Sequence, residues 1–294
     1  MMIRSEWTSA IETHDSRLRP WSDAFVDRRS RGEKHPVHDF LFTYYSFPPA
    51  KLKQWVPSVG VVLEGVDADD RVAWPWLQSD RFSLVENSLT LDTSRLDARA
   101  RSTAKWIAEL CDGILARPAR FRCFGLHEWA MVYRQTEEQV RHAQHALRLT
   151  APDLARFVES QALCCTHYDA FRFFTPEARP LNSFTPTLAQ REQMEQGGCL
   201  HANMDLYKWA VKLWPWAGAD LIADCFFLAL EGRDLDMRAS PYDLAALGYD
   251  PVRIETPEGR EIYENEQRKL AEKATPVRLR LKAAAEAVCQ WGID

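Results

Sequence analysis

The spacing of apolar residues is the feature that most limits how this chain can fold. Between about residues 94 and 115, apolar side chains recur three or four residues apart, at Leu96, Ala100, Thr103, Ile107 and Leu110. This spacing places them on one face of a helix. Pro118 follows and is expected to end the segment.

The rest of the chain reads mainly as helix as well. Further helices are predicted at 203–213, 219–230 and 258–288, the last interrupted near Pro276. A β-like run near 59–64, an acidic turn and a possible return near 71–74 predict one minor β-hairpin within 59–76. We find no internal repeat and no linker-like composition, so residues 1–294 are predicted to form a single, mainly α-helical globular domain.

Composition narrows the functional classes. The 294 residues are 46% hydrophobic and 27% charged, enough to bury a sizeable core, and the formal net charge is −5. An acidic chain is not typical of a duplex-DNA binder, although a local basic face is compatible with these numbers. Seven cysteines without a C-x-x-C pair indicate reduced thiols. No apolar run is long enough for a membrane span, and we expect a cytoplasmic protein without a leader peptide.

Two groups of residues carry the spacing expected of acid–base chemistry. His201 and Asp205 are four residues apart, so on a helix they share one face. Asp169 lies among three phenylalanines and a tyrosine, where an ionised carboxylate needs a partner. Arg172 is the nearest candidate for that partner, and the alternative is a carboxylate of raised pKa facing a cavity.

A metal site is a separate possibility. His127 and Glu128 form a second patch of ionisable residues, and with His201 and Asp205 they are candidate ligands for a divalent metal. The sequence contains no H-E-x-x-H and no cysteine ligand pair. This hypothesis therefore depends on residue type alone. The glycine-rich nucleotide motifs and G-x-S-x-G are absent as well.

Three segments resemble a bacterial family of similar length that is commonly labelled 3-methyladenine DNA glycosylase and is not of the helix–hairpin–helix type. The segments are HPVHDFLFTYYS at 35–46, GCLHANMDLYKW at 198–209 and LDMRASPYD at 235–243. The resemblance implies hydrolysis of the N-glycosidic bond of an alkylated purine without a cofactor. It also implies as partner a DNA with alkylated bases or a small purine-like ligand.

Such an enzyme stacks the extruded base on aromatic rings and uses a carboxylate near the sugar. The resemblance makes Asp205 or Asp169, with His201, the candidate catalytic residues. The residues expected to contact the substrate are Tyr44, Tyr45, Tyr168, Arg172, Trp209, Arg238, Tyr242 and Asp243.

Three classes of function stay open from the sequence. They are an alkylpurine glycosylase, a helical metalloenzyme that acts as an oxygenase or hydrolase on a small molecule, and a non-catalytic protein that binds a small molecule in an aromatic pocket. The oligomeric state does not follow from the residues.

Overall fold

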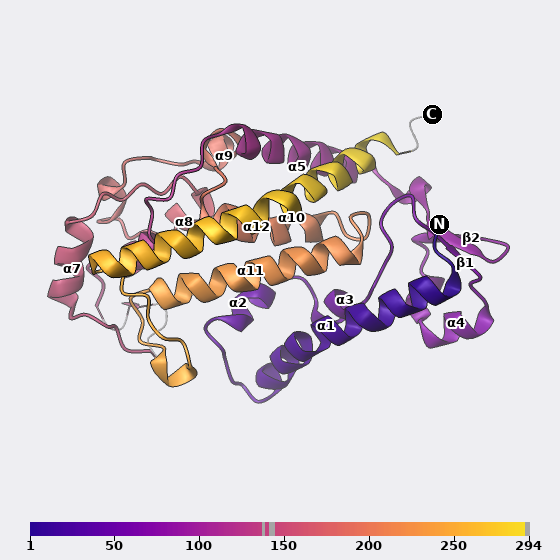
Figure 1. Ribbon diagram of the computed structural model, residues 1–294, viewed down its shortest axis with the longest axis horizontal. Coiled ribbons are helices and arrows are strands. Elements are labelled where there is room, and N and C mark those ends of the chain that lie inside the picture. Colours follow the sequence, from indigo (N-terminus) through magenta and orange to yellow (C-terminus); the bar gives the residue numbers. More distant parts are fainter. Residues whose placement is uncertain (137–138, 141–144, 292–294) are drawn as a thin grey trace. The chain divides into compact units, whose positions relative to one another are not determined.

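The computed structural model describes residues 1–136, 139–140 and 145–291 (Figure 1). Most of this part of the chain is helical, which confirms the predicted mainly α class with a minor β element. The α-helices are α1 Arg4–Ser30, α2 His38–Thr43, α3 Pro49–Lys53, α4 Ala68–Ala73, α5 Ala98–Ala116, α6 Leu126–Val132, α7 Ala151–Glu159, α8 Tyr168–Phe171, α9 Arg191–Met194, α10 Leu200–Lys212, α11 Ala219–Ala239 and α12 Pro257–Gln290. Short 3-10 helices are η1 Pro75–Gln78, η2 Thr93–Arg95, η4 Arg179–Leu181, η5 Leu188–Gln190 and η6 Ala245–Leu247.

The residues group into two compact units. Unit 1 contains residues 1–111, 206–227 and 277–294, and unit 2 contains residues 112–205 and 228–276.

Helix α1 is the longest element that belongs wholly to unit 1. Its buried residues recur at helical spacing, at Trp7, Ile11, His14, Leu18, Ser22 and Phe25, and the backbone N–H of Ile3 donates to Glu6 Oε2 at 2.9 Å at its start. Burying a large apolar side chain contributes about 1.5–3 kcal/mol, so this face fixes the helix on the unit 1 core. Pro20 lies on the exposed face, and the helix runs through it.

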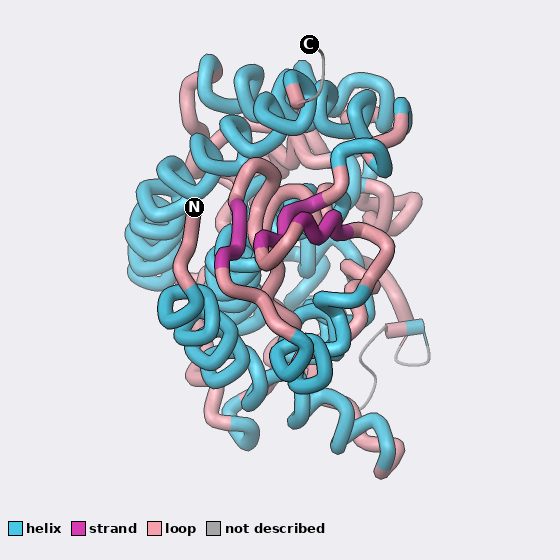
Figure 2. The backbone as a smooth tube through the Cα atoms, turned by 90° about the vertical axis from the view of Figure 1, so that its right-hand side faces the viewer, coloured by secondary structure: helices cyan, strands magenta, loops and turns pink. Residues whose placement is uncertain are grey.

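The small sheet of unit 1 differs in position from the predicted hairpin. Its strands are β1 Val62–Glu64, β2 Phe82–Val85 and β3 Ser88–Leu91, all antiparallel in the order β1-β3-β2 (Figure 2). Only β1 lies within 59–76, where the expected return strand is instead helix α4. Asp67 explains the difference, since its side chain accepts from Asp70 N at 2.8 Å and caps a helix rather than making a turn.

Two other helix boundaries also differ from expectation. Helix α12 continues through Pro276, which is exposed, and α11 extends nine residues past the predicted end at 230, to Ala239. The extension of α11 brings Arg233 and Asp236 into the helix.

In unit 2, a left-handed turn determines where α6 begins. Phe124 and Gly125 have φ values of 45° and 70°. A Cβ atom at Gly125 would lie 3.3 Å from the ring of Tyr263, so glycine meets both the φ and the space requirement. This turn starts the helix that carries His127.

A second close approach joins the segments before α6 and α10. The side-chain amide of Gln196 accepts from Arg120 N at 2.8 Å and donates to Arg120 O at 3.2 Å. A Cβ at Gly198 would lie 2.5 Å from Arg120 O. These contacts hold residues 120–123 next to the start of α10, where His201 is found.

No helix in the described part of the chain is both long and apolar enough to cross a membrane.

The start of α12 provides a stability prediction. A Cβ at Gly259 would lie 1.8 Å from the carbonyl oxygen of Arg253, a backbone atom that cannot move independently. We expect Gly259→Ala to lower the free energy of unfolding by about 2–3 kcal/mol, measured by urea denaturation. Gly197→Ala is the control, since a Cβ atom at Gly197 would lie 4.0 Å from the Ile114 side chain, its nearest neighbour. Equal stabilities of the two variants would contradict the packing described here.

Candidate metal centre in unit 2

Three side chains from three helices of unit 2 converge on one point. They are His127 from α6, His201 from α10 and Asp236 from α11. Each offers a ligand atom, and these atoms all lie within 4.8 Å of one another. The two imidazole rings meet edge to face, with centroids 4.2 Å apart and an interplanar angle of 86°. This is a donor set of two imidazoles and one carboxylate.

One imidazole and the carboxylate of the cluster lie at contact distance. His127 Nε2 and Asp236 Oδ1 are 2.8 Å apart. Two ligands about 2.1 Å from one metal and at right angles would be roughly 3 Å apart. A separation of 2.8 Å fits two ligands of a common ion, and it also fits a direct contact between an imidazole and a carboxylate.

A buried guanidinium orients the carboxylate. Arg233 Nη1 lies 2.6 Å from Asp236 Oδ2 and 2.9 Å from Glu128 Oε1, and all three side chains are at least 90% buried. With Asp236 Oδ2 engaged, Oδ1 is the oxygen that faces His127. Arg233 is thus shared between two buried carboxylates, beside two imidazoles. Buried carboxylates need compensating positive charge, which a bound cation can supply.

The protonation states suit ligation. Burial, and then the neighbouring His127, lower the pKa of His201 well below its usual value, so its ring is neutral at pH 7. Burial opposes ionisation of Asp236, but His127 and then Arg233 outweigh it, and its pKa lies below the ordinary range. A neutral imidazole and an ionised carboxylate are the forms that bind a metal.

A third imidazole lies beside the cluster. The ring of His167 is 5.4 Å from that of His201, and its Nε2 is 3.3 Å from both Glu195 Oε1 and Asp205 Oδ2. Burial lowers the pKa of His167, but the two carboxylates outweigh it and the net shift is upward. Asp205, expected to share a helix face with His201, lies against His167.

The other predicted acids are held by arginines. Asp169 contacts Arg191 and lies 3.5 Å from Arg172 Nε, so it takes part in ion pairs rather than in the metal cluster. Glu128 faces Arg233. Of the four candidate ligands from the sequence, the structure brings together His127 and His201, and Asp236 takes the carboxylate position expected for Glu128 or Asp205.

The predicted substrate contacts are dispersed. Tyr44, Tyr45 and Trp209 belong to unit 1, where Tyr45 packs on Tyr207 and Trp209 on Trp106. The remaining five lie in unit 2 outside the cluster: Tyr168 begins α8, Arg172 is next to Asp169, Arg238 donates to Asp250 O, Tyr242 is buried, and Asp243 accepts from Ala245 N. None of these eight residues lines the small cavity beside His127 and His201.

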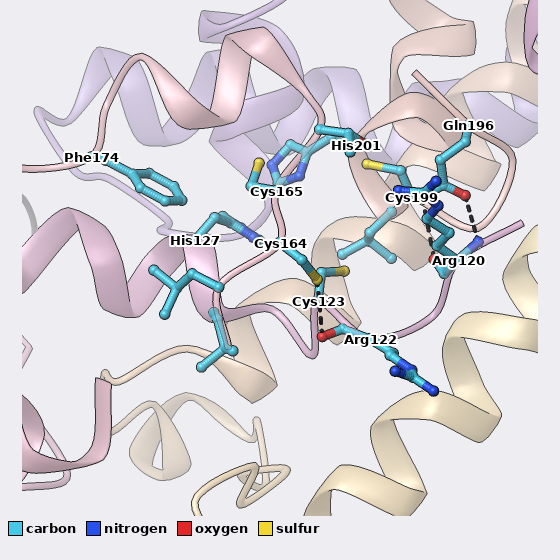
Figure 3. Close-up of a pocket in the computed structure, with 14 residues that line it drawn as sticks. Arg120, Arg122, Cys123, His127, Cys164, Cys165, Phe174, Gln196, Cys199 and His201 are labelled. Atoms are coloured by element: carbon cyan, nitrogen blue, oxygen red, sulfur yellow. Dashed lines mark hydrogen bonds between the residues drawn. The ribbon is translucent and has the colours of Figure 1, made fainter. Parts of the chain in front are cut away.

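A small cavity opens beside the two imidazoles (Figure 3). Its volume is about 30 Å³, and His127 and His201 form part of its wall. Four cysteines from three chain segments surround it: Cys123, Cys164, Cys165 and Cys199. A space of this size admits one or two water-sized molecules.

Sequence reasoning missed Asp236 and His167 as site residues. Asp236 lies in a helix with Arg233 three residues before it, a spacing that usually indicates a local ion pair. The available signal was weak, because Arg233 and Asp236 stand among several other charged residues of the same helix, and a charged pair needs further partners only when it is buried. His167 directly precedes Tyr168 and Asp169, and its spacing from other histidines or acidic residues matched no functional motif.

Comparison with known proteins identifies no relative: no family model matches the sequence, and neither a curated protein nor a solved structure shows significant similarity.

The Arg233 network gives a second stability prediction. Arg233→Met leaves Glu128 and Asp236 buried without their cation, and we expect a loss of about 3–5 kcal/mol in unfolding free energy. Adding Glu128→Gln should recover part of it, since one uncompensated charge is removed. Arg268→Met, which breaks the exposed i,i+4 pair with Glu264, should cost less than about 1 kcal/mol. Similar losses for the two arginine variants, by urea denaturation, would refute the role given to Arg233.

Proposed function

We propose that this protein is a metal-dependent enzyme that acts on a small molecule, with His127, His201 and Asp236 as the ligands of one divalent ion. The convergence of their three ligand atoms within 4.8 Å carries the proposal. The burial of Asp236 and its contact with Arg233, which orients the carboxylate, support it. The competing explanation is a structural ion-pair network in which a proton on His127 balances Asp236.

Three protein ligands are typical of catalytic rather than structural metal sites. Structural sites close the coordination sphere with a fourth protein ligand, whereas catalytic sites leave positions for water and substrate. No fourth ligand joins the group among the described residues. The ion would polarise a substrate oxygen or bind a small co-substrate there. Oxygenase and hydrolase chemistry are both compatible with this donor set.

Metal content separates the proposal from the ion-pair explanation. After incubation with Zn²⁺, Mn²⁺ or anaerobic Fe²⁺ and removal of free ions, the wild-type chain should retain about one ion. His127→Ala and Asp236→Asn should retain less than about a tenth, because each loses one of three ligands. His145→Ala, a histidine of unit 2 outside the cluster, is the control and should bind as wild type. A wild-type chain that retains no metal by elemental analysis would end the proposal.

Glycosylase activity on alkylated purines is the second candidate, carried by the resemblance of three segments. The burial of Asp205 and Asp169, which are 1% and 7% exposed, supports it, because a glycosylase needs a shielded carboxylate. A flipped base requires more room than the cavity of about 30 Å³, since ligand pockets usually span about 300–1,000 Å³. This function therefore requires the cavity to open.

Release of free base from alkylated duplex DNA tests this second candidate. We expect wild-type protein to release 3-methyladenine and Asp205→Asn to lose at least about 100-fold of the rate, if Asp205 stabilises the developing sugar cation. Equal release of the base by wild type and variant would reject Asp205 as the catalytic carboxylate. If the protein does not bind DNA even at low salt, the glycosylase function is rejected.

We also propose a cytoplasmic location. All seven cysteines are free thiols, which is typical of a reducing compartment.

A further inference from the structure

We infer that the cavity beside His127 and His201 takes a diatomic gas, dioxygen, as the co-substrate of a ferrous ion held by His127, His201 and Asp236. This inference depends on the proposed metal site and specifies its metal and co-substrate.

The donor set is the first argument. Two imidazoles and one carboxylate with open positions are the ligand set of non-haem ferrous sites that use dioxygen. The ligands here come from three separate helices, and the cavity wall contains both imidazoles. A molecule in the cavity is therefore next to the ion's ligands.

The chemical nature of the cavity wall is the second argument. Apolar side chains contribute much of it, namely Leu126, Leu163, Phe174 and Leu200. The polar amide of Gln196 is already bound to the backbone of Arg120. Figure 3 shows the Arg122 side chain directed away from the two imidazoles. A small, largely apolar space suits an apolar diatomic molecule better than water, which needs several polar partners.

The four thiols belong to this apolar surface. Burial raises the pKa of Cys164 to about 11 and of Cys165 to about 12. It likewise raises the pKa of Cys123 above the usual value. These three thiols are therefore neutral at pH 7, and together with the buried Cys199 they act as small hydrophobic groups. Since the thiolate is the reactive form, they are protected from oxidation next to a dioxygen site.

The cavity also lacks what a hydrolytic site needs. A general base must lie within hydrogen-bond reach of the attacking water. No aspartate or glutamate lines the cavity in the part of the chain that the structure describes, and its only imidazoles are the two proposed ligands. No carboxylate therefore lines this space to accept the proton of an attacking water molecule.

Nitric oxide is the probe of choice, because it occupies the dioxygen position of a ferrous site without turnover. Full-length protein loaded with Fe²⁺ under anaerobic conditions should give the S = 3/2 electron paramagnetic resonance signal of a ferrous nitrosyl. Leu163→Phe narrows the cavity and should retain iron while nitric oxide binds at least tenfold more slowly by stopped flow. Leu188→Phe, at a leucine that is 62% exposed, is the matched control and should behave as wild type.

The outcomes separate the two levels of the hypothesis. If wild-type protein binds Fe²⁺ but gives no nitrosyl signal, or binds only Zn²⁺ or Mn²⁺, the dioxygen inference is overturned and the metal site stands. If it binds no metal, the proposed function itself fails.

Xenon provides a measurement that needs no variant and covers the case in which Leu163→Phe does not fold. Crystals of the unaltered protein under xenon pressure should show a xenon atom in this cavity, as apolar cavities bind this gas. A cavity that contains only ordered water under these conditions would overturn the inference.

Discussion

The carboxylate of Asp236 is the group on which the site in unit 2 depends. One oxygen lies 2.6 Å from the guanidinium of Arg233 and the other lies 2.8 Å from His127 Nε2. Burying this charge is costly unless it is compensated. Arg233 compensates it but is shared with Glu128, so both buried carboxylates contact the same guanidinium. In the proposed function, a bound cation would supply further compensation for this charge, which links the energetics of the fold to the proposed activity.

Much of the helical architecture follows from local sequence, because apolar spacing over three or four turns is a strong signal. The helix that follows Leu96 was found this way. Pro276 misled the interpretation, since it lies on the exposed face of a long helix that packing holds together despite a missing backbone bond. The sheet was placed too early because its strands have only three or four residues, too few to show a pattern. Asp67 could equally begin a turn or cap a helix.

The site was half predictable, for a physical reason. His127 and His201 were singled out by residue type, since imidazoles in apolar surroundings need a role. The packing of three helices determines which carboxylate lies beside these histidines. A single sequence does not reveal contacts between residues that are distant in the chain. Glu128 directly follows His127 in the sequence, and Asp205 lies one helical turn after His201. The structure nevertheless places Glu128 against Arg233 and Asp205 against His167. In the sequence, Asp236 resembles any acidic residue of a helix, because His127, which it contacts, is more than 100 residues away in the chain.

The most direct measurement is anomalous diffraction from crystals soaked in Fe²⁺ or Zn²⁺, recorded on both sides of the metal absorption edge. The account predicts one strong anomalous peak about 2.1 Å from ring nitrogens of His127 and His201 and from Asp236 Oδ1. A peak elsewhere in the molecule, or an imidazolium of His127 hydrogen-bonded to Asp236 with no metal between them, would contradict it.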